Sequence, residues 1–186
     1  GPFLYSDGKA SLLPGLVPTA PNVSNSSASN WVGGINDHGQ VVATMMDEKG
    51  AAHIVLYDHG ALQDLGLGSS AFGKGINNQG QILGNLGAGP WTTPGLYDHG
   101  KWTNLQDMLS PASAGWKLLF AYDLNDLGQI RAWAVNDSLD LVKNVILSPD
   151  NLPALAEPHP VPEPTALMLA GLVIAGCAIR RRFRHG

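Results

Sequence analysis

The chain is poor in cysteine, in charge and in the motifs of common enzymes. One Cys among 186 residues excludes an internal disulfide, so packing and β-pairing must stabilise the fold. There is no phosphate-binding loop, no dinucleotide-binding glycine pattern and no Gly-x-Ser-x-Gly elbow, and no two carboxylates stand out by their spacing. These absences exclude the best-marked enzyme classes, and we expect a protein without catalytic activity or a cofactor.

Positive charge is scarce over most of the chain. Residues 1–164 contain seven basic and all 15 acidic residues, a net charge of −8, whereas residues 165–186 carry +4. A nucleic-acid-binding protein needs a basic face to neutralise phosphates. Nucleic acid is therefore excluded as a partner of the acidic region.

Glycine is abundant, with 23 residues, and it recurs in two repeated patterns. A Leu-Tyr pattern with Gly three residues after the Tyr occurs at 3–9, 55–61 and 95–101, and an Asn pattern with Gly three residues after the Asn occurs at 35–41, 76–82 and 124–130. Each pattern predicts a β-hairpin whose Gly adopts positive φ and whose Asn side chain bonds the turn backbone. The structural turn residues are Asn36, Gly39, Asn77, Gly80, Asn125 and Gly128.

The repeats predict an all-β fold. Two hairpins in roughly 40 residues give a four-stranded antiparallel β-meander, the content of one β-propeller blade. We expect about three such units over residues 1–149, each starting with its Leu-Tyr hairpin, as a partial propeller. Residues 145–147 are expected to open a further unit.

The repeats resemble the HAF repeats of extracellular bacterial proteins. The third repeat departs from that pattern at Leu124 and Arg131. The resemblance implies an extracellular repeat architecture but no reaction. The second repeat carries it best, through His53, Leu56, Tyr57, Leu65, Gly66, Gly75, Ile76, Asn77, Gly80, Gln81 and Gly84.

Three Asp-His-Gly triplets, at 37–39, 58–60 and 98–100, contain metal-ligating residue types. We interpret them as hairpin turns, in which Asp bonds backbone amides, and we expect no metal. A calcium site at Asp37 and Asp126 is the alternative. The tryptophans could form a carbohydrate-binding surface, but we expect them to pack between sheets; they are Trp31, Trp91, Trp102, Trp116 and Trp133.

The C-terminal segment contains an uncharged apolar run from Ala166 to Ile179, followed by arginines. This run predicts a short transmembrane helix within residues 165–186, with its arginines in the cytoplasm; a buried helix of a water-soluble core is the alternative. The anchor residues are Ala166, Leu167, Leu169, Leu172, Val173, Ile174 and Ile179, and the basic end comprises Arg180, Arg181, Arg182 and Arg184.

A proline-rich linker, residues 150–164, precedes the helix and ends in Val161, Pro162, Glu163 and Pro164. Together with the apolar run and the arginines, this motif resembles the PEP-CTERM sorting signal of Gram-negative bacteria. The resemblance implies recognition by exosortase, a membrane transpeptidase. It also implies anchoring in the inner membrane with the body outside the cytoplasm, followed by transfer to the cell surface or the extracellular space.

Export requires a signal peptide, and Gly1 begins no such pattern. We therefore expect a signal and earlier repeats upstream of this sequence. Two functions remain open. One is a non-catalytic surface or matrix protein associated with exopolysaccharide. The other is an exported carbohydrate-binding or carbohydrate-active propeller whose site lies in the missing repeats.

Overall fold

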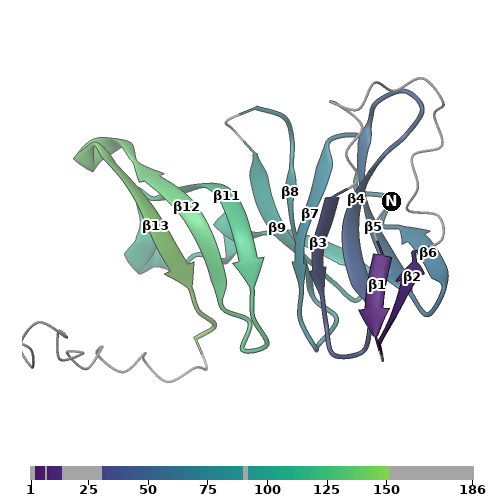
Figure 1. Ribbon diagram of the computed structural model, residues 1–186. Helices are drawn as coiled ribbons and strands as arrows, with labels where there is room; N and C mark the ends of the chain where they lie inside the picture. Colours follow the sequence, from purple (N-terminus) through teal and green to yellow (C-terminus); the bar gives the residue numbers. More distant parts are fainter. Residues whose placement is uncertain (1–2, 7, 14–30, 90–91, 151–186) are drawn as a thin grey trace, which may run out of the picture. The chain divides into compact units, whose positions relative to one another are not determined.

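The computed structural model describes residues 3–6, 8–13, 31–89 and 92–150 (Figure 1). The chain divides into two units, Gly1–Leu152 and Pro153–Gly186, and the second lies outside the described residues. Within the described residues the first unit consists of antiparallel β-strands and three short 3-10 helices. The all-β part of the predicted fold is thus observed.

The strands form one hairpin and three larger sheets. In each of the larger sheets, consecutive strands pair as antiparallel neighbours, which makes each sheet a meander. The hairpin consists of β1 (Phe3–Ser6) and β2 (Lys9–Leu12). The first sheet consists of β3 (Trp31–Ile35), β4 (Val41–Met46), β5 (Ala52–Asp58) and β6 (Ala61–Asp64); the second of β7 (Ala71–Ile76), β8 (Ile82–Leu86), β9 (Thr93–Asp98) and β10 (Lys101–Asn104); the third of β11 (Lys117–Leu124), β12 (Ile130–Asn136) and β13 (Leu141–Leu147).

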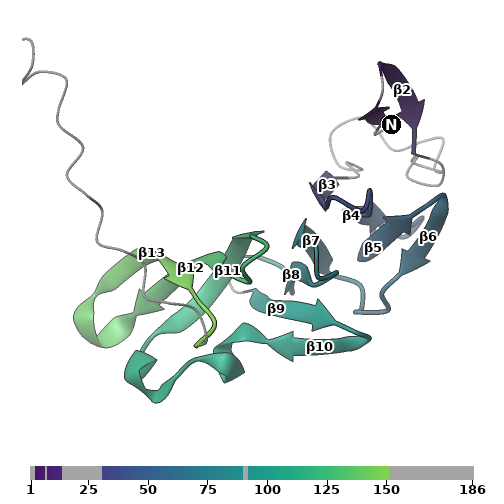
Figure 2. The same ribbon diagram turned by 90° about the horizontal axis from the view of Figure 1, so that it is seen from below.

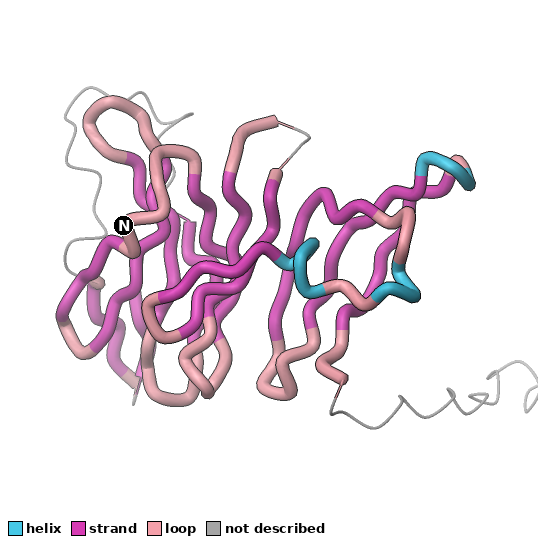
Figure 3. The backbone as a smooth tube through the Cα atoms, turned by 180° about the vertical axis from the view of Figure 1, so that it is seen from behind, coloured by secondary structure: helices cyan, strands magenta, loops and turns pink. Residues whose placement is uncertain are grey.

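The short helices lie in the connection that leads into the third sheet and in one connection within it, as Figure 3 shows. Helices η1 (Leu105–Met108) and η2 (Pro111–Ser113) join β10 to β11, and η3 (Asp137–Leu139) joins β12 to β13. None of the helices in the described part of the chain is long and apolar enough to cross a membrane. The predicted transmembrane helix, residues 165–186, and the linker from residue 151 onward lie outside the described residues.

The first strand of each later sheet packs across the sheet before it: β7 contacts β3, β4 and β5, and β11 contacts β7, β8 and β9 (Figure 2). Glycine makes this close approach possible. A Cβ atom at Gly33 would lie 2.6 Å from the carbonyl oxygen of Gly73, a distance that no side chain can occupy without moving the backbone.

Buried side chains form three clusters that follow the order of the sheets. In one cluster, Leu13 packs with β4 and β5 of the first sheet. A second cluster joins the first and second sheets and contains Ile54 and Ile82. The third joins the second and third sheets and contains Leu83 and Leu118. Each sheet therefore buries its apolar residues against its neighbour in sequence, as in a stacked repeat protein.

Two expectations about the grouping of strands are wrong. Each four-stranded sheet begins with the Asn-pattern hairpin and ends with the Leu-Tyr hairpin, the reverse of the expected unit. Residues 145–147 do not open a further unit, because they belong to β13, which pairs with β12 over Ile130–Asn136. Among the described residues, the first Leu-Tyr hairpin, β1–β2, consequently pairs with no further strand.

Candidate functional site

The three Asn-pattern turns share one local geometry. Asn77 Oδ1 accepts hydrogen bonds from the backbone N–H groups of Gln79 and Gln81 at 3.1 and 3.0 Å, and Asn77 Nδ2 donates to Gln81 Oε1 at 2.8 Å. Asn36 and Asn125 make the equivalent bonds in their own turns. The turn glycines Gly39, Gly80 and Gly128 have φ of 74°, 78° and 74°, a region that favours residues without Cβ.

The same asparagines link the sheets to one another. Asn36 Nδ2 donates to the backbone oxygen of Asn77 at 3.1 Å, and Asn77 Nδ2 donates to that of Asn125 at 3.4 Å. Asn36 and Asn77 are 8% and 2% exposed, whereas Asn125 is exposed. We call this series of turns the asparagine ladder; its third member has no following sheet among the described residues.

A second row of bonds runs beside the ladder. The Asn78 amide donates to Asp37 Oδ2 at 2.7 Å and to Asp126 Oδ2 at 2.9 Å. Asn78 Oδ1 accepts from the Asp37 N–H, and Asp126 Oδ1 accepts from the Asn78 N–H, each at 2.8 Å. Asp37 and Asp126, the two carboxylates of the alternative calcium site, thus accept hydrogen bonds from the Asn78 amide. The described residues contain no group of three or more His, Cys, Asp or Glu side chains that could hold a metal ion.

The Leu-Tyr turns connect to the ladder through glutamine. Gln40 Nε2 donates to Asp58 Oδ2 at 3.0 Å, and the equivalent Gln81 donates to Asp98 Oδ2 at 3.2 Å. The bond from Gln40, reinforced by His59, lowers the pKa of Asp58 from its ordinary value. His59 has φ of 46° and is 82% exposed, so this triplet places its His on the surface of a turn.

His53 lies between two carboxylates, an arrangement that the sequence analysis missed. His53 Nδ1 is 3.0 Å from Asp64 Oδ2, and Nε2 is 3.6 Å from Asp47 Oδ2. Bonds from the Ala51 and Lys49 backbone amides lower the pKa of Asp47, with Ala51 the larger contribution. The group lines a pocket of about 350 Å³ whose other lining residues are Met45, Met46, Val55 and Leu62. The lining of this pocket contains no Ser, Thr, Cys or Lys side chain.

The cross-strand pairing explains why sequence reasoning missed this group. His53 faces Met45 on β4, and Asp64 faces Val55 on β5, so the contact between His53 and Asp64 forms diagonally across β5 and β6. Asp47 enters the group from the β4–β5 turn. Neither of these carboxylates belongs to a repeated pattern that would have pointed to the histidine.

The tryptophans fall into two environments. Trp102 and Trp116 are half-buried and pack against the inter-sheet clusters, as expected. Trp31 is 54% exposed, but its ring centroid lies 6.3 Å from that of Phe72 on the second sheet, so it packs at the edge of that sheet boundary. Trp133 is 43% exposed and contacts Tyr122 of its own sheet, so the expectation that it fills the space between sheets is wrong. Trp91 lies outside the described residues.

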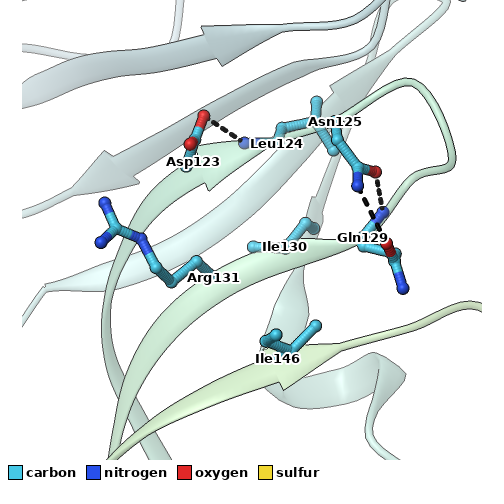
Figure 4. A pocket seen from close by; sticks show the side chains of 7 residues that line it. All are labelled: Asp123, Leu124, Asn125, Gln129, Ile130, Arg131 and Ile146. Atoms are coloured by element: carbon cyan, nitrogen blue, oxygen red, sulfur yellow. Dashed lines mark hydrogen bonds between the residues drawn. The ribbon is translucent and has the colours of Figure 1, made fainter. Parts of the chain in front are cut away.

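A small pocket of about 130 Å³ lies beside the third turn (Figure 4). Asp123 and Arg131, which are paired across β11 and β12, lie on one side of it, and Ile146 of β13 lies on another. Asp123 Oδ1 accepts a hydrogen bond from the Leu124 N–H at 3.0 Å.

The residues predicted to direct sorting lie outside the described residues, so their identification comes from sequence comparison. The PEP-CTERM protein-sorting motif matches residues 160–182, which include the Pro162-Glu163-Pro164 motif and most of the apolar and basic segment. The chain carries a PEP-CTERM sorting signal. This signal indicates an exported protein that an exosortase recognises and that is processed at the membrane. We found no match to the chain among curated proteins or among solved structures.

Proposed function

We propose that this chain is a non-catalytic repeat protein of the cell surface or extracellular matrix, associated with exopolysaccharide. Its three sheets are HAF-type repeats and form part of a β-propeller-like stack. Its C-terminal helix anchors it in the inner membrane, with the body outside the cytoplasm, until exosortase acts at Pro162-Glu163-Pro164. The match of the sorting motif at residues 160–182 carries this proposal.

The described residues support a structural role. Their best-organised polar groups, the asparagine ladder and the Asp37–Asn78–Asp126 row, bond to one another and to backbone. Groups that are satisfied in this way stabilise a stack of sheets and have little capacity left for a substrate. The acidic character of residues 1–164 suits an exported, water-exposed module.

The test is the location and the mature C-terminus of the full-length protein in a host that has an exosortase. A variant with Glu163→Ala and Pro164→Ala should accumulate in the membrane with Arg180–Arg184 intact, whereas the natural sequence should lose that end. The matched control is Glu157→Ala with Pro158→Ala, which changes the same residue types just outside the motif. Surface protein that keeps its arginines, or equal processing of both variants, would contradict the proposal.

A further inference from the structure

The far face of the third sheet differs from the faces through which the sheets stack. Residues offset by 41 and 48 positions are equivalent, as the bonds of the asparagine ladder show. At one such position the first two sheets have Val42 and Leu83, both fully buried, and the third has exposed Arg131. A charged, exposed residue thus occupies the place of a buried apolar one.

A second equivalent position shows the same change. Thr44 Oγ1 accepts a hydrogen bond from the Gly73 N–H at 3.0 Å, and Asn85 bonds both the N–H and the carbonyl of Ala121 at 2.8 Å. Both side chains are buried and bridge to the following sheet. The third sheet has Trp133 here, which is 43% exposed.

The third turn also lacks the polar side chain that, in the first two turns, contacts a backbone carbonyl of the next sheet's turn. His38 Nε2 lies 3.2 Å from the Asn78 carbonyl, and Gln79 Nε2 donates to the Asp126 carbonyl at 2.9 Å. The equivalent residue is Leu127, which is 60% exposed and has no polar side-chain atom. Three positions therefore indicate that the far face of the third sheet is not built to receive another sheet of this kind.

Rings and a cation of this face, together with a lysine that reaches them from β7 of the second sheet, form a continuous group. We call it the aromatic–cation patch: Phe120, Tyr122, Arg131 and Trp133 of the third sheet, and Lys74. The ring centroids of Phe120 and Tyr122 are 4.9 Å apart, and those of Tyr122 and Trp133 are 6.4 Å apart. Lys74 Nζ lies 4.9 Å from the Phe120 centroid, and Arg131 Cζ lies 5.2 Å from the Tyr122 centroid.

The two cations have no carboxylate partner within the described residues. Asp123, the nearest acid in the strand register, bonds the Leu124 backbone and makes no ion pair with Arg131. Cation–π contacts hold a charged group beside a ring but leave its N–H donors available to a ligand. Lys74 and Arg131 therefore place two cations beside the rings of the patch, against one carboxylate, Asp123, in register on the same face.

We propose that the aromatic–cation patch binds an acidic polysaccharide, with Trp133 stacking on a sugar ring and Arg131 and Lys74 binding its carboxylates. A pyranose ring has an apolar C–H face that packs on an aromatic ring, and a uronate adds a carboxylate whose two oxygens match a guanidinium. This inference rests on the proposed association with exopolysaccharide and names the class of glycan. It places the site on the third sheet, with Lys74 contributed by β7 of the second.

The test measures retention of the full-length protein, in detergent, on immobilised polygalacturonate and on its neutral methyl ester. Arg131→Gln and Trp133→Ala should each weaken binding to polygalacturonate by at least about tenfold, equivalent to about 1.4 kcal/mol. The methyl ester should bind more weakly than the acid, and salt should weaken binding to the acid.

Two matched controls distinguish binding by the patch from binding by any cation or any exposed ring of the protein. Lys143→Gln removes a cation from the other face of the same sheet, and Tyr5→Ala removes an exposed ring on β1; both should bind like the natural sequence. The unfolding midpoint of each variant must match the natural one. If Trp133→Ala fails to fold, Trp133→Leu replaces it.

Three outcomes would overturn the proposal. Equal binding by the patch variants and the controls would place the glycan elsewhere, and equal competition by polyglutamate would show that the patch recognises only negative charge. A dimer that becomes monomeric in Arg131→Gln would make the patch an interface between copies. A protein that is processed at its sorting motif but ignores polygalacturonate would refute this inference and leave the proposed function intact.

Discussion

At the scale of single residues, one side-chain type performs two tasks. Each ladder asparagine closes its own turn through Oδ1, and those of the first two sheets also bond the next sheet through Nδ2. The repeated Asn-x-x-Gly spacing was sufficient to predict the local bonds, because an Asx-type turn needs only nearby backbone. It could not predict the bonds between sheets, since these depend on where the next turn lies.

Replacement of Asn77 by Ala should reduce the free energy of unfolding by about 0.5 to 2 kcal/mol, the range for the loss of a side chain that caps backbone amides. The matched control is Asn125→Ala, which removes the same local bonds at the exposed end of the ladder. The bond from Asn77 to the Asn125 carbonyl should make the first loss the larger one. Denaturant unfolding of both variants measures the difference, and equal losses would contradict a role between sheets.

Asp47 should make the protein sensitive to acid. Because its backbone bonds lower its pKa in the folded state, its contribution to stability is present above the unfolded pKa of about 3.9 and is lost as the pH falls through the folded pKa. Asp47→Asn keeps an acceptor oxygen but cannot titrate. The melting temperature of the natural protein should exceed that of the variant at pH 6, and the gap should close below about pH 4. A gap that does not change with pH would contradict this assignment.

At the scale of elements, the sheets are joined by a few buried polar bridges. Asn85 is fully buried in β8 and satisfies both the N–H and the carbonyl of Ala121 in β11. These backbone groups lie at the register shifts between β11 and β12, where the regular ladder of bonds is interrupted. The side chain thus replaces bonds that the irregular strand pairing leaves open.

Asn85→Ala should therefore destabilise the protein by at least about 2 kcal/mol, because it leaves two buried backbone groups without partners. The control is Asn144→Ala, the same change at an exposed position on β13, which should stay within about 0.5 kcal/mol of the natural protein. Thermal or denaturant unfolding distinguishes the two. Similar midpoints for both variants would show that water replaces the bridge.

At the scale of the whole molecule, the described sheets form a series in which each contacts its neighbours in sequence. The second sheet contacts both others, through β7 with the first and through β7, β8 and β9 with the third. Stability in such a series comes from each sheet and from its interfaces with neighbouring sheets. Because the second sheet has two such interfaces, we expect it to be the best protected against local unfolding. The hairpin β1–β2 has two strands and exposes Phe3, Tyr5 and Leu12.

Amide hydrogen exchange of the full chain should follow this order. Amides of β8, which contains Leu83 and Asn85, should exchange most slowly, and those of β1 and β2 should exchange fastest among the strands. Mass spectrometry after peptic digestion gives this order directly. Protection of β1–β2 equal to that of β8 would mean that a further surface covers the hairpin.

The sequence alone determined the hairpins and the sorting signal. Both depend on local patterns: Asn-x-x-Gly and Leu-Tyr with Gly specify tight turns, and Pro162-Glu163-Pro164 with its apolar and basic segment is a linear signal. The exposure of His59 and its turn conformation also follow from local chemistry.

Only the tertiary structure decided how hairpins join into sheets and which face ends the series. The connections before and after the β5–β6 hairpin, residues 47–51 and 65–70, are of similar length, so the sequence could not show that Leu62 pairs within the first sheet while Ala71 starts the second. His53 contacts Asp64, and Arg131 contacts Tyr122, because of the register between neighbouring strands. No linear sequence pattern predicts that register. The departure at Arg131 was visible in the sequence, but its exposure on a terminal face required the packing of all three sheets.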